Sequence, residues 1–194
     1  CLVEEVVRVF GYDRVPAVAV RCASALPEPA LSPEQGRRAT ARRVLAAQGL
    51  MEVVTLSFTS SKHAELFAAV PESLRLVNPI SADTDVMRPS VLPNLIAALV
   101  RNAKRGFPDA ALFEVGPQYT GVGSADQATL AAGVRSGSAH PRSWAQPPRG
   151  VDAFDAKADA LALTAALGIS EDRVRIEAKA PPYYHPGRGG VLRL

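Results

Sequence analysis

The chain has 194 residues, of which 47% are hydrophobic and 21% are charged, a balance typical of a folded protein rather than a disordered or fibrous one. Its longest uncharged stretches are about half as long as a membrane span requires, which excludes a spanning segment and a membrane partner. The formal net charge of +3 comes from 22 basic against 19 acidic residues, so charge alone neither demands nor excludes an RNA partner.

The cysteines and the first residues favour a cytoplasmic protein. Cys1 and Cys22 lack metal-ligand spacing and are too few to stabilise a fold of this size as disulfides. The opening residues form an amphipathic run with acidic side chains, unlike a signal peptide. We therefore expect a location in the reducing cytoplasm and one main globular domain.

The first predicted elements are a helix and a connector. Residues 2–10 place Val3, Val6, Val7 and Phe10 at helical spacing. Gly11 is expected to supply a left-handed helix end. The stretch from Arg14 to Pro29 is interrupted by prolines and predicts an extended segment.

The next start signal is stronger. Ser32 is a predicted helix cap, Pro33 suits the first helical position, and Gln35 completes a capping box, with the helix ending at Gly49. Residues 51–58 alternate as in a strand, and we expect both of its faces to be at least partly covered.

The remaining elements predict the fold class. Residues 62–69 favour a short helix, 74–77 an extended segment and 78–88 a loop; longer helices are expected over 92–105, closed by Gly106, and over 156–167, ended by Gly168. Strand candidates are 111–115, 130–135, 174–177 and 191–194. Because strands mostly do not alternate one-for-one with helices, we predict an α+β fold with a mostly antiparallel sheet flanked by helices.

Few residues suggest catalytic or metal chemistry. His63, His140 and His185 stand far apart, without the spacing of a zinc site. Ser57, Ser60 and Ser61 lack a nucleophile-elbow pattern, and no phosphate-binding P-loop occurs. The sequence therefore gives no support for a hydrolase or a P-loop enzyme.

Two groups of cations lie on predicted helices, and only the first is a candidate RNA contact. One has spacings that predict one side of the first long helix, where it either contacts phosphates or is a solvated face: Arg37, Arg38, Arg42 and Arg43. The other, Arg101, Lys104 and Arg105, lies in the last turn of its helix, where positive charge complements the helix dipole.

A loop rich in aromatic residues and glycine precedes the last strand. It runs from Tyr183 and Tyr184 through His185 and Arg188 to Gly190. Its side chains are able to stack and to donate hydrogen bonds, so it either holds a ligand or is a tight, glycine-shaped turn.

Several segments in order resemble the beta subunit of bacterial phenylalanine–tRNA ligase, and together they span nearly the whole chain. They are LVEEVVRVFGYDRVP at 2–16, NPIS at 78–81, MRPS at 87–90, the stretch 95–105 ending in RNAKR, FEVG at 113–116, FDAK at 154–157 and HPGR at 185–188. The ordered combination is far more specific than any one motif.

The resemblance implies three parts: residues 1–12 end a small helical domain, 13–29 connect, and 30–194 form a synthetase-like core module truncated at its C-terminus. In that family the module is a degenerate copy of a class II catalytic domain. Catalysis belongs to the alpha subunit, which binds ATP, phenylalanine and the tRNA acceptor end in a heterotetramer of two alpha and two beta chains.

The degeneracy is visible in two motifs. Active class II sites hold the ATP α-phosphate with a strand arginine next to a glutamate, and the corresponding strand here, 111–116, has the glutamate without the arginine. Likewise, Ser90 stands where related active enzymes have the carboxylate of an Arg-Pro-Glu motif. We therefore expect no catalytic residue in this chain.

The resemblance also implies a magnesium site at the contact with the alpha subunit, to which Glu4 and Glu5 correspond, while Cys1 replaces an aspartate. Because magnesium prefers oxygen ligands, this ligand set is at most half complete, and no metal is expected in the isolated chain. The leading hypothesis is thus a non-catalytic assembly role. The alternatives are an RNA-binding module that uses the arginines of residues 37–43, and an enzyme with its own site around His185 and Arg188.

Overall fold

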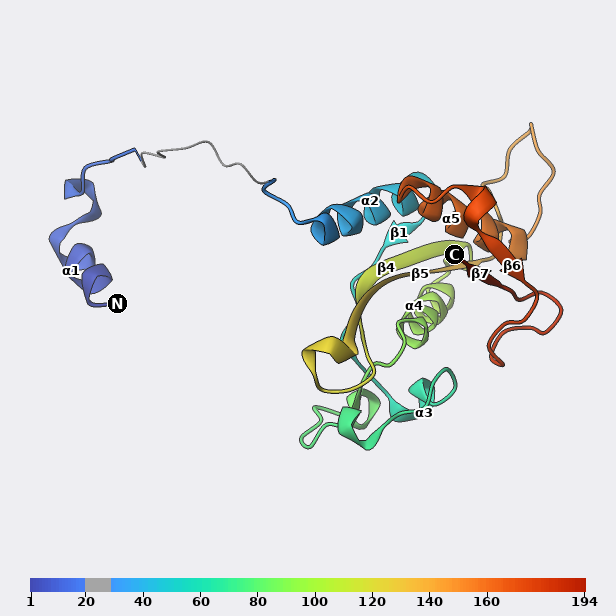
Figure 1. The fold of residues 1–194 in the computed structure, drawn as a ribbon, viewed down its shortest axis with the longest axis horizontal. Helices are drawn as coiled ribbons and strands as arrows, with labels where there is room; N and C mark the ends of the chain where they lie inside the picture. Colours follow the sequence, from blue (N-terminus) through green and yellow to red (C-terminus); the bar gives the residue numbers. More distant parts are fainter. Residues whose placement is uncertain (20–28) are drawn as a thin grey trace. The chain divides into compact units, whose positions relative to one another are not determined.

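A computed structural model describes residues 1–19 and 29–194, which divide into two compact units, Cys1–Ser32 and Pro33–Leu194 (Figure 1). Residues 20–28 of the predicted connector lie outside the described residues, as does Cys22. Among the described residues, no helix has the length and apolar character needed to cross a bilayer.

The first unit contains the predicted helix α1 (Leu2–Phe10) and a short 3-10 turn, η1 (Tyr12–Arg14). No residue of α1 is buried. Gly11 ends the helix with φ 106° and ψ 125°. The prediction of a left-handed end is therefore wrong in part: φ is positive, as only glycine readily allows, but ψ is extended because the chain turns directly into η1.

The second unit is built on a three-stranded sheet in the order β1–β4–β5. Strand β1 (Met51–Glu52) runs parallel to β4 (Ala110–Tyr119), with Met51 opposite Leu112. Strand β5 (Gln127–Ser136) runs antiparallel to β4 along its whole length, with the 3-10 turn η4 (Ser124–Asp126) between them.

Helices cover both faces of this sheet. On one face, α2 (Pro33–Ala47) and α5 (Ala153–Ala166) contribute to a core that contains Leu45, Phe113 and Val115. On the other, α4 (Leu92–Lys104) packs Leu95 and Ala98 against Leu112. This division follows from the two-residue period of β4, which directs alternate side chains to opposite faces.

The three long helices of this unit end by one device, a glycine with positive φ. At the end of α2, Gly49 has φ 82°, its N–H donates to the carbonyl of Ala46, and the N–H of Leu50 donates to Leu45. This is the Schellman pattern. Gly106 and Gly168 make the equivalent pairs of bonds after α4 and α5. The predicted ends of these helices are confirmed.

Smaller elements complete the unit. They are α3 (Ser61–Ala64), the 3-10 turns η2 (Glu72–Leu74), η3 (Ala82–Thr84) and η5 (Glu171–Arg173), and two antiparallel pairs, β2 (Phe58–Thr59) with β3 (Val86–Met87) and β6 (Arg175–Glu177) with β7 (Val191–Arg193). With one parallel pair against three antiparallel ones, the predicted α+β class is confirmed.

The predicted strand over 51–58 is wrong, because only its two ends pair as β1 and β2. Between them Val54 and Leu56 are 89% and 63% exposed, so one predicted face is not covered. The ladder with β4 stops because the N–H and hydroxyl of Thr55 donate to the Glu114 carboxylate instead of to a strand carbonyl.

Three further expectations for residues 62–88 are corrected. The short helix ends at Ala64, Leu74 lies in a 3-10 turn, and the loop 78–88 contains strand β3. Strand β3 has only two residues, and its existence depends on β2, so no local period marks it in the sequence.

Candidate functional site

A buried ion pair joins the two motifs that suggested a degenerate active site. Arg88 follows β3 and is fully buried, while Glu114, in the middle of β4, is 3% exposed. Their closest atoms, Nη2 and Oε1, are 2.7 Å apart. A buried pair of this kind is stable only when hydrogen bonds satisfy the remaining donors and acceptors.

Every side of this pair is satisfied by the protein. The Arg88 Nε donates to the carbonyl of Pro117 at 2.8 Å, and Nη1 donates to the Thr55 hydroxyl at 2.8 Å. The second carboxylate oxygen of Glu114 accepts from that same hydroxyl at 2.6 Å. The arginine therefore ties β4 to residues 55–56 and to the end of β3, and each of its three guanidinium nitrogens donates to a protein oxygen.

Glycine at position 116 makes this arrangement possible. A Cβ built on Gly116 would lie 2.7 Å from Arg88 Nη2 and equally close to Glu114 Oε1. These distances are below van der Waals contact, so a larger residue would displace the pair. The glycine of the FEVG motif, residues 113–116, is therefore needed for packing around the buried pair.

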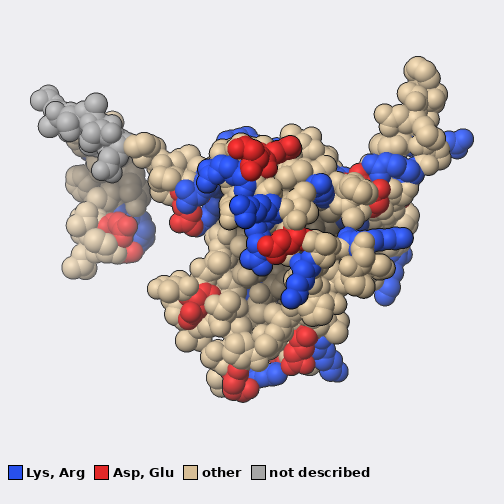
Figure 2. Space-filling model, turned by 45° about the vertical axis from the view of Figure 1, so that its right-hand side comes forward, with Lys and Arg blue, Asp and Glu red and all other residues tan. Residues whose placement is uncertain are grey.

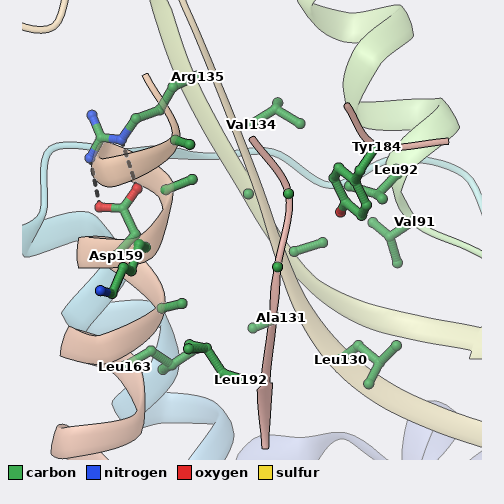
Figure 3. A pocket seen from close by; sticks show the side chains of 18 of the residues that line it. Val91, Leu92, Leu130, Ala131, Val134, Arg135, Asp159, Leu163, Tyr184 and Leu192 are labelled. Carbon is green, nitrogen blue, oxygen red and sulfur yellow. Dashed lines mark hydrogen bonds and ion pairs between the residues drawn. The ribbon is translucent and has the colours of Figure 1, made fainter. Parts of the chain in front are cut away.

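A cleft of about 930 Å³ runs along β5 (Figure 3). Six successive residues of β5, 130–135, line it. Because successive strand residues point to opposite faces, the cleft follows the edge of the sheet rather than one face. Its other walls come from α5, from β7 and from the loop 183–190, represented in Figure 3 by Leu163, Leu192 and Tyr184.

Two of the charged residues that line the cleft, Arg135 and Asp159, neutralise each other. Arg135 on β5 and Asp159 on α5 form two parallel hydrogen bonds of 2.7 and 2.8 Å, and Arg135 also donates to the carbonyl of Gln48. The hydrogen bonds that Arg135 donates to the Asp159 carboxylate raise the pKa of Arg135 above its ordinary value. The bonds of Arg135 join β5 to α5 and to the end of α2 on one face of the sheet. They therefore stabilise the fold.

The aromatic loop is packed against the protein and shaped by glycine. The ring of Tyr183 lies 5.1 Å from Phe67 and 4.8 Å from Tyr184, and partial burial raises the pKa of Tyr184, with a smaller contribution from Tyr183. A Cβ on Gly189 would lie 2.8 Å from the Cβ of Ala180. These contacts support the tight-turn interpretation of this loop.

His185 and Arg188 do not form a catalytic pair. The Nδ1 of His185 accepts from the Gly187 N–H at 3.1 Å, which fixes the turn, and Arg188 makes no ion pair within the described ranges. His63, His140 and His185 do not come together either, since the described residues hold no cluster of three or more potential metal ligands. The structure thus offers no acid–base machinery at this loop.

The four arginines of α2 do not form one face. Arg38 pairs with Glu34, whose pKa it holds below the ordinary value, and Arg42 pairs with Glu52 at 2.7 Å and with the carbonyl of Val115. At about 100° per residue, Arg37 and Arg43 point about 120° apart, so the prediction of one side is wrong. The sequence already indicated this difference in direction, because six residues separate Arg37 from Arg43. Whether these arginines bind RNA stays a prediction.

Glu5 pairs with Arg8 of the same helix at 2.8 Å. Glu4 lies beside it in the first turn of α1. Magnesium is usually held by one or two carboxylates, with water completing its octahedral shell. Glu4 and Glu5 are two carboxylates on an exposed helix, and a magnesium site shared with an alpha subunit stays a prediction.

The fold of the chain is similar to that of solved aminoacyl-tRNA synthetases. It is similar to PylSc, a pyrrolysyl-tRNA synthetase of Desulfitobacterium hafniense, with a TM-score of 0.52 and 17% identity over 76% of this chain and 50% of that chain. A crystal structure of pyrrolysyl-tRNA synthetase from the same organism gives a TM-score of 0.50 and 16% identity, covering 74% and 50%. The fold is that of a class II aminoacyl-tRNA synthetase catalytic domain.

Sequence comparison identifies the family. The model of the phenylalanyl-tRNA synthetase beta chain CLM domain matches residues 19–194. The phenylalanine–tRNA ligase beta subunits of Paramagnetospirillum magneticum and Rhodospirillum rubrum are 51% and 47% identical over 193 residues, which cover 100% of this chain and 24% of each relative. The chain belongs to the phenylalanyl-tRNA synthetase beta chain family, and it spans about a quarter of the length of these relatives.

Proposed function

We propose that this chain is a non-catalytic core part of a phenylalanine–tRNA ligase beta subunit. In this proposal it supports the ATP-dependent attachment of phenylalanine to tRNA by assembling with a catalytic alpha subunit, as two alpha and two beta chains. The observation that carries the non-catalytic part is the buried pair of Arg88 and Glu114.

The chemistry of adenylation explains the importance of this pair. Negative charge develops on the α-phosphate of ATP, and an active site needs a cation that faces the open cleft at that point. Strand β4 has no arginine, and its only carboxylate is buried. The cation that pairs with this carboxylate, Arg88, is fully buried and donates to Pro117, Thr55 and Glu114. Neither charge is available to a nucleotide.

An exposed apolar stretch supports the assembly role. Along residues 53–57, Val53 and Thr55 turn inward while Val54 and Leu56 are 89% and 63% exposed. Neighbouring apolar side chains on one exposed segment are typical of a surface that a partner covers. We assign this segment, between β1 and β2, to the contact with the alpha subunit.

The direct test is to mix the purified chain with a matching alpha subunit and to follow complex formation by size-exclusion chromatography with light scattering. We expect co-elution at micromolar concentrations and its loss in the double variant Val54→Asp/Leu56→Asp. The matched control is Val77→Asp/Ile80→Asp, at side chains that are 94% and 92% exposed elsewhere. If the unmodified proteins never associate, the assembly role is refuted for this chain.

A second experiment tests the non-catalytic part separately. The chain alone is incubated with ATP and phenylalanine, and phenylalanyl-adenylate is measured by pyrophosphate exchange. We expect no exchange above background. Exchange by the purified chain without an alpha subunit would contradict the proposal.

The alternative of an RNA-binding module that uses α2 has less support. Two of its four arginines are neutralised by Glu34 and Glu52, and the remaining two point in different directions. If tRNA bound through this helix, Arg37→Gln/Arg43→Gln would weaken binding at low salt. Unchanged binding would mean that Arg37 and Arg43 are solvated and do not contact RNA.

A further inference from the structure

One edge of the three-stranded sheet is open along the whole of β5. In the order β1–β4–β5, strand β5 has a neighbour on one side only. Among the described residues, the backbone of residues 127–136 hydrogen-bonds to β4 alone. A strand directs its N–H and C=O groups to both sides, so about half of the backbone groups of β5 have no protein partner in the described part of the chain.

Strand β5 lacks the features that usually protect such an edge. Natural edge strands are short, carry charged side chains or proline, or are interrupted by a bulge. Strand β5 pairs with β4 residue for residue over ten positions, and it contains no proline. Its one charged residue, Arg135, is neutralised by Asp159. By contrast, the edge strand β1 has only two residues, one of them Glu52. The edge of β5 is therefore suited to pair with another strand.

The cleft along β5 gives such a strand room. It follows residues 130–135 and has a volume of about 930 Å³. At about 3.4 Å per residue, an extended segment that pairs with this stretch is about 20 Å long. Its walls are apolar on both faces of the sheet: Tyr184 and Leu92 lie near Val134, while Leu163 of α5 lies on the opposite side (Figure 3). A strand placed here would bury alternate side chains on each face.

The charges of the cleft indicate the chemistry of this segment. Four charged residues line the cleft, of which Arg135 and Asp159 neutralise each other. The other two, Lys157 on α5 and Arg188 in the loop 183–190, are exposed and make no ion pair within the described ranges. On the side of the second unit that carries α5, β6 and β7, basic side chains outnumber acidic ones (Figure 2). Carboxylates on the incoming segment would complement these cations.

We propose that the edge of β5 and its cleft form a docking site for an extended protein segment with an apolar core and acidic residues at its ends. We call this site the β5 groove. The segment adds a strand to the sheet: backbone hydrogen bonds hold it, while the apolar walls and the two cations select its side chains. A small anion would leave the strand edge unpaired, and a second copy of the chain would bring the same two cations to the contact. The proposal is independent of the assembly role, which uses the segment between β1 and β2.

Peptide binding to the whole chain tests the proposal. The probe is the fluorescein-labelled peptide Glu-Glu-Val-Thr-Val-Thr-Val-Glu-Glu, whose core favours a strand and whose acidic ends allow either strand direction. One control peptide has lysine in place of each glutamate. The other carries methyl groups on the backbone nitrogens of its core, which removes the hydrogen-bond donors. By fluorescence anisotropy we expect saturable binding of the probe, and binding about 10-fold weaker or less for both controls.

Amide hydrogen exchange, followed by NMR, locates the peptide on the chain. An added strand accepts from every second N–H of β5, because the N–H groups between them already donate to β4. We expect the probe peptide to slow exchange at alternate amides of residues 130–135 and to leave the others unchanged. Binding to a helix or a loop would not produce this alternation.

A charge-reversed variant tests the two cations. Lys157→Glu/Arg188→Glu should weaken binding of the probe by about 10-fold, because repulsion replaces attraction at two positions, and it should strengthen binding of the lysine peptide. The control Arg37→Glu/Arg43→Glu makes the same change in net charge at exposed side chains of α2 that do not line the cleft. It should change both affinities by less than about 2-fold. Circular dichroism should show the same fold in each variant, since all four side chains are exposed.

Four results would overturn the proposal. They are no binding of the probe at low salt, no loss of affinity on backbone methylation, equal affinities in the charge-reversed variant, and protection of the same β5 amides at raised protein concentration without peptide. The last would assign the edge to a second copy of the chain. None of them affects the test of the assembly role, which depends on Val54 and Leu56.

Discussion

Replacement of Arg88 by methionine tests the buried pair on which the non-catalytic proposal depends. The substitution keeps an unbranched side chain but leaves Glu114, which is 3% exposed, without its cation. Removal of one partner from a buried ion pair costs about 3–5 kcal/mol, because the other charge stays buried and uncompensated. Domains of this size unfold with about 5–15 kcal/mol, so the loss is a large fraction of the total.

The assay is urea denaturation followed by circular dichroism. With a urea dependence of about 2 kcal/mol per molar, a loss of 4 kcal/mol lowers the midpoint by about 2 M. The exposed arginine variant Arg37→Met is the matched control and should change the free energy of unfolding by less than about 0.5 kcal/mol. The double variant Arg88→Met/Glu114→Leu should recover most of the loss, because both charges are then removed.

The reasoning is refuted if Arg88→Met costs less than about 1 kcal/mol, or if the double variant is less stable than the single one. In the first case the pair would not be the closed, fully desolvated contact that its distances indicate. In the second case Glu114 would stabilise the fold even without its cation, through its bonds to Thr55, and would not be an uncompensated buried charge.

Further predictions concern glycine and acid sensitivity. Gly116→Ala should lower the free energy of unfolding by about 2 kcal/mol, because the added methyl group overlaps the buried pair; urea denaturation measures it. Gly49→Ala, at φ 82°, should cost about 1–2 kcal/mol, whereas Gly36→Ala, inside α2 with open space around it, should stabilise by about 0.8 kcal/mol; opposite signs in thermal denaturation are the check. The hydrogen bond from Arg149 holds the pKa of Asp155 well below its usual value. The stability from this carboxylate is therefore fully present above about pH 4 and is lost as pH falls through the folded pKa. Asp155→Asn should be destabilising at pH 7, and the loss of stability should shrink as pH falls from 4 toward 2.

The helices could be predicted well because their signals are local. The ends of α2, α4 and α5 follow from single glycines, and a Schellman turn needs only the residues around it. The segment 51–58 could not be predicted correctly from its alternating pattern. Thr55, in its middle, bonds to the side chain of Glu114, which is 59 residues away in the sequence. Strand β3 was missed for the same reason, since its partner β2 is distant in sequence.

In the candidate site, too, residue identities could be predicted from the sequence, while contacts between distant residues could not. Sequence alone found the motifs around Arg88 and Glu114, the missing strand arginine and the family to which the chain belongs, because these are matters of residue identity and order. Only the tertiary structure decided that Arg88 and Glu114 neutralise each other and that two arginines of α2 are paired with Glu34 and Glu52. The physical reason is that ion pairs and shared surfaces depend on distances of a few ångströms between residues far apart in the chain, which no local pattern records.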